Sequence, residues 1–162
     1  MRTVKGFTLV ELMVTIAVLG IIAAIAVPSL ATMVESSRAS SQVNLYRDML
    51  TLARAEAINR GAVVRVVQLA DGSWVVGTGA ALNSCAAAGA IRCFPAPNQG
   101  ATLTTASIPA GGIAFTSQGY VRGLELTAAA PTLTIKFTDQ CSYNRVISVS
   151  PIGRIRSEKG GC

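Results

Sequence analysis

The chain has 162 residues, of which 51% are hydrophobic, only 5% are aromatic and none is histidine. Without histidine, the chain has neither a His-based catalytic triad nor a His-ligated metal. A net charge of +6 is only mildly basic, unlike that of a protein dedicated to nucleic acid, and the length suits one modest domain plus a long helix.

The first thirty residues combine a basic start with an apolar run that contains one acid. Residues 12–30 form 19 consecutive uncharged positions, close to the roughly 20 that cross a bilayer as a helix. Glu11 stands at the start of this run. A carboxylate costs about 2.5–3.5 kcal/mol at the membrane centre and less near its edge. Glu11 therefore requires a positively charged partner.

Cleavage behind Gly6 would supply that partner, because it leaves a free amine on Phe7, four residues before Glu11. The string GFTLVELM, followed by an apolar run and Pro28, resembles the N-terminus of type IV pilins and of the pseudopilins of type II secretion. The resemblance implies that a prepilin peptidase cuts between Gly6 and Phe7 and methylates the new amine. It also implies that Glu11 neutralises the N-terminal amine of a neighbouring subunit in the filament.

Two simpler interpretations of this segment stay open. Ala24-Ile25-Ala26 fits the A-x-A cleavage site of an ordinary secretory signal, which would release a soluble periplasmic protein. The segment would otherwise be a lone membrane anchor that does not assemble. Both interpretations leave Glu11 unexplained.

The resemblance implies the type IV pilin fold. This is an α+β architecture in which a long N-terminal helix packs on a mostly antiparallel β-sheet domain. We expect a leader peptide over residues 1–6 and a helix over residues 7–60, with a transmembrane segment at about 9–30. A β-rich globular domain should follow over residues 61–162.

The helix should have an apolar half for the membrane or filament and an amphipathic half that packs on the sheet. Apolar residues of the second half recur at helical spacing: Leu45, Met49, Leu52, Ala53 and Ala57. Gly61 is the expected stop signal. The string from Leu52 to Arg60 resembles a segment of the GspH/FimT/FimU subfamily of minor pilins and pseudopilins. On physical grounds, Arg54 and Glu56 are interpreted as polar residues on the exposed side of the helix.

Short β-branched runs separated by turn signals predict strands after Gly61. The expected strands are Val63–Leu69, Trp74–Val76, Ile113–Phe115, Tyr120–Leu126, Thr132–Thr138, Arg145–Val149 and Ile152–Ile155. Asp71-Gly72 should turn the first hairpin. Ser84–Gly100, which is rich in small residues, is interpreted as a loop.

Four cysteines in a chain that carries an export signal suggest disulfides: Cys85, Cys93, Cys141 and Cys162. Of three possible connectivities we favour Cys85–Cys93 and Cys141–Cys162, because these pairs close the smallest loops. A zinc site is the alternative, but no cysteine pair has the usual two-to-four-residue spacing. We expect no metal, no cofactor and no enzymatic activity, since no phosphate-loop or dinucleotide motif is present either.

The C-terminal region concentrates positive charge in Arg154, Arg156 and Lys159, with Arg145 one strand earlier. Side chains alternate along a strand, so Arg154 and Arg156 should share one face while Ile155 points to the core. Two neighbouring guanidinium groups suit a phosphate backbone. The string GRIR resembles the GRxR motif of DNA-binding minor pilins of the FimT type. The alternative is a solvated strand face that protects a sheet edge from aggregation.

The expected function is a minor type IV pilin that enters a pilus after prepilin peptidase cleavage and binds DNA, whatever its sequence, for natural transformation. The alternative is a structural minor pilin or pseudopilin that primes or caps a pilus or secretion pseudopilus without binding DNA. Other pilin and minor pilin subunits, the peptidase and the inner membrane are the expected partners. The chain should cross the inner membrane once, with its globular domain in the periplasm, and then join a pilus at the cell surface.

Overall fold

A computed structural model describes residues 6–79, 81–97, 101–109, 111–122, 130–137 and 144–160, with the backbone only at residue 32. Within these residues one helix, α1 (Leu9–Arg60), precedes eight strands in two antiparallel sheets. The expected α+β class is therefore confirmed. The chain divides into two compact units, Met1–Arg38 and Ala39–Cys162, so the second half of α1 belongs to the same unit as the sheets.

Helix α1 runs without interruption through Pro28 and ends where the sequence predicts. Gly61 has a φ of 62°, a conformation that glycine adopts without steric cost. The Gly61 amide donates to the Ile58 carbonyl (3.3 Å), and the Ala62 amide donates to the Ala57 carbonyl (3.2 Å). These two bonds form a Schellman motif, which satisfies carbonyls that the helix end would otherwise leave unpaired.

The first unit is an apolar helix whose side chains are not packed against other residues of that unit. An 18-residue window near the N-terminus has a mean hydropathy of 2.6 and no buried residue, so the helix is long and apolar enough to cross a membrane. Its large apolar side chains are exposed from Phe7 to Val34. Leaving this surface in water is unfavourable, so the segment requires lipid or protein around it.

The first sheet has the strand order β3-β2-β1-β5. Its strands are β1 (Val64–Gln68), β2 (Trp74–Thr78), β3 (Ala90–Phe94) and β5 (Ile113–Phe115). In the β1–β2 turn, the Ser73 amide and hydroxyl donate to Asp71 Oδ1 at 3.0 and 2.6 Å, and these bonds lower the pKa of Asp71. Strand β3 corrects the prediction that Ser84–Gly100 is entirely a loop, because Ala90–Phe94 pairs along β2.

The second sheet has the strand order β4-β6-β7-β8, which places β8 at an edge. Its strands are β4 (Ala101–Ala106), β6 (Thr132–Phe137), β7 (Arg145–Val149) and β8 (Ile155–Lys159). The prediction of a strand over Ile152–Ile155 was wrong, because residues 150–154 form the β7–β8 turn and β8 begins only at Ile155. Of the expected strand Tyr120–Leu126, only Val121 forms a bridge, to Phe115; residues 123–126 lie outside the described part.

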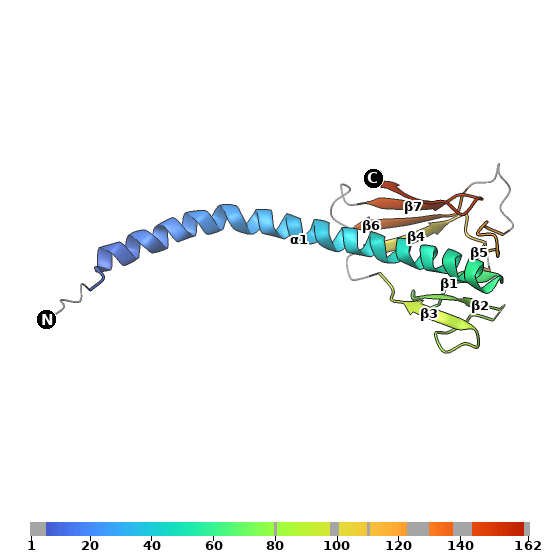
Figure 1. Ribbon diagram of the computed structural model, residues 1–162. Coiled ribbons are helices and arrows are strands. Elements are labelled where there is room, and N and C mark those ends of the chain that lie inside the picture. The colour runs from blue at the N-terminus through green and yellow to red at the C-terminus, as the bar shows by residue number, and fades with distance from the viewer. Residues whose placement is uncertain are drawn as a thin grey trace. The chain divides into compact units, whose positions relative to one another are not determined.

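One core joins the second half of α1 to both sheets (Figure 1). The helix contributes side chains that are wholly buried: Tyr46, Met49, Leu50, Ala53 and Ala57. The Tyr46 ring meets the Trp74 ring edge to face at 6.3 Å, and its hydroxyl donates to the Pro95 carbonyl (3.4 Å). Burial raises the pKa of Tyr46 to about 12. The amphipathic pattern predicted for this half is confirmed.

A disulfide joins Cys85 to Cys93, as predicted. Cys93 lies in β3 opposite Val75 of β2, so the bond fastens the preceding loop to the sheet. The other predicted pair, Cys141–Cys162, lies outside the described residues.

Candidate functional site

The predicted cleavage point lies just outside the helix. Gly6 and Phe7 are exposed and precede α1, which begins at Leu9. The peptide bond between them is therefore in a non-helical segment, the conformation in which a peptidase can bind a chain. The Phe7 side chain is 74% exposed and has no covering from the rest of its unit.

Glu11 has a partner within its own chain that the sequence reasoning missed. Glu11 Oε2 accepts hydrogen bonds from the Thr8 amide (3.2 Å) and the Thr8 hydroxyl (3.0 Å). In return, the Glu11 amide donates to the Thr8 hydroxyl oxygen (3.2 Å). This reciprocal arrangement is a capping box, which satisfies amides that have no partner at a helix start. The T-x-x-E spacing of Thr8 and Glu11 was the signal that could have revealed it.

The GRIR segment lies at the start of edge strand β8. Arg154 belongs to the hairpin turn: its amide donates to the Ser150 hydroxyl (3.0 Å) and its carbonyl accepts from the Ser150 amide (2.9 Å). Arg156 lies in β8 opposite Ser148. Ile155, between the two arginines, packs against the core, and both arginines are exposed. Alternation along β8 thus places Arg156 on the outer face of the second sheet, opposite to the core face of Ile155, while Arg154 is exposed at the end of the turn.

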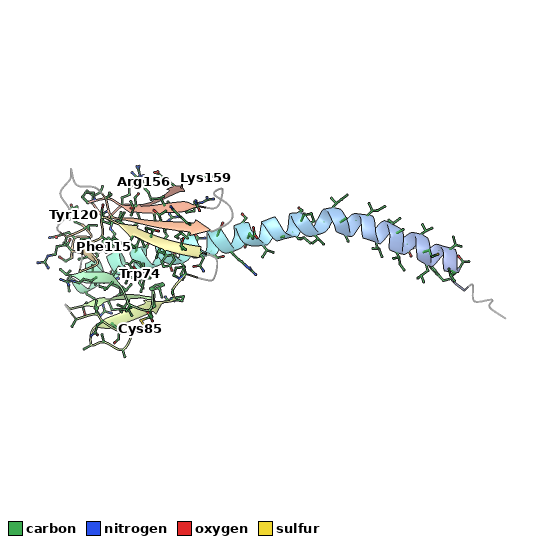
Figure 2. All side chains as sticks on the ribbon, turned by 180° about the vertical axis from the view of Figure 1, so that it is seen from behind. Trp74, Cys85, Phe115, Tyr120, Arg156 and Lys159 are labelled. Carbon is green, nitrogen blue, oxygen red and sulfur yellow. A yellow bond between two sulfur atoms is a disulfide. The ribbon has the colours of Figure 1, made fainter. Side chains whose placement is uncertain are left out.

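Arg145 and Lys159 lie opposite each other on neighbouring strands, but on the other face of the sheet from Arg156. Arg145 shares its face with Ile147, which is buried in the core. Lys159 lies on this face near the end of β8, where it is exposed. Both Lys159 and Arg156 belong to the edge strand, so they lie on the same side of the globular unit in Figure 2 although they point to opposite faces of the sheet. The structure therefore separates the four basic residues: Arg156 lies on the outer face of the sheet, Arg154 is exposed in the turn before it, and Arg145 and Lys159 lie on the other face.

Two glycine turns meet behind Arg154. Gly119 and Gly153 have φ angles of 81° and 75°, and a Cβ on Gly153 would lie 2.0 Å from the Gly119 carbonyl oxygen. The Val121 amide donates to the Pro151 carbonyl (2.8 Å), which ties the two turns together. We call the place where these two turns meet, with Gly119 on one turn and Gly153 on the other, the glycine junction. Glycine suits both positions because of their positive φ, and at Gly153 the Gly119 backbone also leaves no room for a Cβ.

Arg54 of α1 binds the glycine junction. Its Nε donates to the Gly119 carbonyl (3.1 Å) and its Nη2 to the Ile152 carbonyl (3.4 Å). The interpretation of Arg54 as a merely polar residue on an exposed helix side was therefore wrong. Its partners lie 65 and 98 residues away in sequence, so helical periodicity gave no signal for them. Glu56 forms a salt bridge with Arg60 within the helix.

Comparison with known proteins places the chain in a family. Residues 42–153 match the family described as "Type II transport protein GspH", and residues 1–27 match the "Prokaryotic N-terminal methylation motif". The first match covers more than half of the chain, so the protein belongs to the GspH family.

Individual known proteins resemble part of the chain or its fold. The chain is 43% identical over 58 residues to the type IV major fimbrial protein FimA of Dichelobacter nodosus, and the match spans 36% of this chain and only 35% of that protein. Two crystal structures of the type IV minor pilin FimU of Pseudomonas aeruginosa share the fold. Their TM-scores are 0.53 and 0.55, with 24% and 23% identity. They cover 75% and 76% of this chain, and the matches span 90% and 88% of the FimU chains.

Proposed function

We propose that the chain is a minor pilin that is processed at Gly6–Phe7, assembles into a type IV pilus and binds DNA through Arg154 and Arg156. The match of residues 1–27 to the methylation motif supports processing, as does the exposed, non-helical position of the cleavage point. The mature chain should start at Phe7 with a methylated amine. Mass spectrometry of the mature protein tests this, and an intact Met1 or a start at Val27 would contradict it.

Before assembly, α1 anchors the chain in the inner membrane through residues 9–30, with the globular unit in the periplasm. The bare apolar surface of the first unit supports this location. The Cys85–Cys93 disulfide supports a periplasmic globular unit, because such bonds persist in oxidising compartments. In the filament, other pilin and minor pilin subunits replace the lipid around the helix.

Glu11 then serves two partners in succession. In the single chain it accepts from Thr8 through Oε2. During assembly it also neutralises the Phe7 amine of a neighbouring subunit, which prepilin peptidase has exposed. A carboxylate and an amine are each costly in an apolar setting, and pairing them lowers that cost.

The observation that carries DNA binding is the exposure of two neighbouring arginines, Arg154 at the end of the hairpin turn and Arg156 in edge strand β8. Within the described residues neither arginine is paired with an acid. Both guanidinium groups can therefore bind phosphate oxygens. Contacts of this kind carry no base information, which suits the uptake of DNA of any sequence for transformation. Lys159 and Arg145 lie on the opposite face of the sheet from Arg156. They contribute to the overall positive potential rather than contacting the same phosphates.

This division gives a quantitative test. Two neutralised phosphates give a slope of log affinity against log salt of about −1.8 on duplex DNA, whereas three would give about −2.7. Fluorescence anisotropy of labelled duplexes with the full-length protein in nonionic detergent measures this slope. The double variant Arg154→Gln/Arg156→Gln should lose most of the binding, with the slope reduced in magnitude by about 1.8. Arg38→Gln/Arg47→Gln, which removes the same charge from exposed helix positions, is the matched control and should bind almost as well as wild type.

A second candidate function is a structural minor pilin that primes or caps a pilus or pseudopilus without binding DNA. The observation that favours it is Glu158, which shares the outer face with Arg156 and makes that face mixed in charge. Mixed charges on an edge strand also prevent edge-to-edge pairing. This candidate is supported if wild type shows no DNA binding at low salt while deletion of the protein abolishes pili.

A further inference from the structure

We propose that Arg54 is the positioning residue of the DNA site: it holds the turn that carries Arg154. The proposal rests on the proposed DNA-binding function and names a residue, 100 positions before Arg154, on which that site depends. Arg54 contacts the site only through the glycine junction. It acts by fixing backbone rather than by touching phosphate.

The hydrogen bonds around Arg54 form a connected chain from the helix to the site. The guanidinium donates to the carbonyl of Gly119 and to that of Ile152, so one rigid planar group holds both turns. Ile152 is followed by Gly153, whose amide donates to the Ser150 carbonyl (2.8 Å). Arg154 comes next, with its amide on the Ser150 hydroxyl.

Besides these hydrogen bonds, close packing around Gly119 and Gly153 holds the Arg54 side chain against the two turns. A Cβ on Gly119 would lie 2.9 Å from Arg54 Nε and 3.0 Å from Ile58 Cδ1. A Cβ on Gly153 would lie 3.0 Å from the same Nε. The side chains of Arg54 and Ile58 therefore fill the space that a Cβ on Gly119 would need, and Arg54 also fills that beside Gly153. The role of Gly153 in the GRIR string is therefore to leave room for the Arg54 side chain. Only the two arginines of that string contact DNA.

The junction has a direct consequence for Arg154. A phosphate contact from a long side chain is strong only if its backbone is fixed, because otherwise ordering the turn costs entropy on binding. Arg156 lies within β8 and is fixed by pairing with β7. Arg154 lies outside the strand, so its position depends on the turn and on Arg54. Loss of Arg54 should thus weaken the Arg154 contact and spare that of Arg156.

The test variant is Arg54→Met, which keeps a long unbranched side chain but donates no hydrogen bond. One phosphate contact with a salt exponent of 0.9 contributes about eightfold in affinity at 0.1 M salt relative to 1 M. Arg54→Met in the full-length protein in nonionic detergent should therefore weaken binding to a short duplex by up to about eightfold. The salt slope should move from about −1.8 toward about −0.9. Arg47→Met, which removes one exposed charge from the same helix, is the control and should leave the slope unchanged.

A double-mutant cycle separates positioning from other roles. If Arg54 acts through Arg154, Arg54→Met should cost nothing further in an Arg154→Gln background. Equal losses in both backgrounds would overturn the proposal, since Arg54 would then act independently of Arg154. Arg54→Lys keeps the charge but lacks the planar fork. Full wild-type affinity in Arg54→Lys or in Arg54→Met would likewise overturn it.

Amide hydrogen exchange distinguishes failure of this proposal from failure of the proposed function. In Arg54→Met the Val121 and Gly153 amides, which bond across and within the two turns, should exchange faster than in wild type. The wild type could bind no DNA while amide exchange still rises in Arg54→Met. The DNA-binding function would then fail, but the role of Arg54 in holding the two turns would stand. Unchanged amide exchange in Arg54→Met would show that Arg54 does not hold the two turns, whatever the protein binds.

Discussion

Gly153→Ala tests the glycine junction most directly. Alanine at a φ of 75° costs about 1–2 kcal/mol in backbone strain alone. The new Cβ would also lie 2.0 Å from the Gly119 carbonyl oxygen, whereas ordinary contact begins at 3.4 Å. The two turns must therefore separate by about 1.4 Å, the difference between these values, and overpacking of this kind typically costs about 1–3 kcal/mol more. The total loss of unfolding free energy is about 2–5 kcal/mol.

At about 4 °C per kcal/mol for a unit of this size, Tm should fall by about 8–20 °C. Fluorescence of Trp74, the only tryptophan in the chain and 1% exposed, reports unfolding of the globular unit without interference from the membrane helix. Gly61→Ala is the matched control, because Gly61 has a φ of 62° and open space around its Cβ position. It should lose only the strain term, about 4–8 °C. Equal falls in Tm for both variants would refute the steric argument.

Three further predictions concern other parts of the chain. Glu11→Ala should leave membrane insertion intact but prevent recovery in sheared pili, because the Phe7 amine of a neighbour would be unpaired in an apolar setting; normal recovery contradicts the pairing. Replacing Cys85 and Cys93 together by alanine should lower the unfolding free energy by about 2–3 kcal/mol in a denaturant titration, since the bond closes a short loop with a sequence separation of 8; an unchanged midpoint would argue against this. The raised pKa of Tyr46, about 12 against an ordinary 10, favours its neutral form in the folded state. Its contribution is therefore complete below about pH 10 and is lost as pH rises toward 12, by about 2–3 kcal/mol, and Tyr46→Phe should flatten this decline; an equally steep decline in that variant would assign it to other groups.

Local signals in the sequence predicted the parts of the fold that depend on near neighbours. Gly61 ends the helix because a left-handed residue is needed there, and the sequence shows a glycine at that point. Ile113–Phe115 and Arg145–Val149 are strands with the bounds expected from their β-branched and turn residues. The membrane-length run was equally visible, since hydropathy alone defines it.

The missed parts depend on contacts between residues that are distant in the chain. Strand β3 (Ala90–Phe94) is short and lies within a segment rich in small residues; what defines it is its pairing with β2 and the bond from Cys93 to Cys85. The start of β8 was misplaced because the turn before it is set by Gly153 packing on Gly119. The role of Arg54 was hidden for the same reason: its carbonyl partners come from two separate loops. The division of the basic residues between two faces followed only from the β7–β8 register.

The shared core of α1 and the last strands sets the order in which this protein completes itself during synthesis. Tyr46, Met49 and Leu50 are buried together with Ile147 and Val149, about 100 residues later in the chain. At roughly 5–20 residues per second, the helix is made about 5–20 s before its final partners. Strands β1 and β2 follow the helix directly and can cover part of its apolar face, but Ile147 and Val149 complete that cover only at the end of the interval. Folding of the globular unit is thus a late event, completed only when nearly the whole chain has emerged from the ribosome.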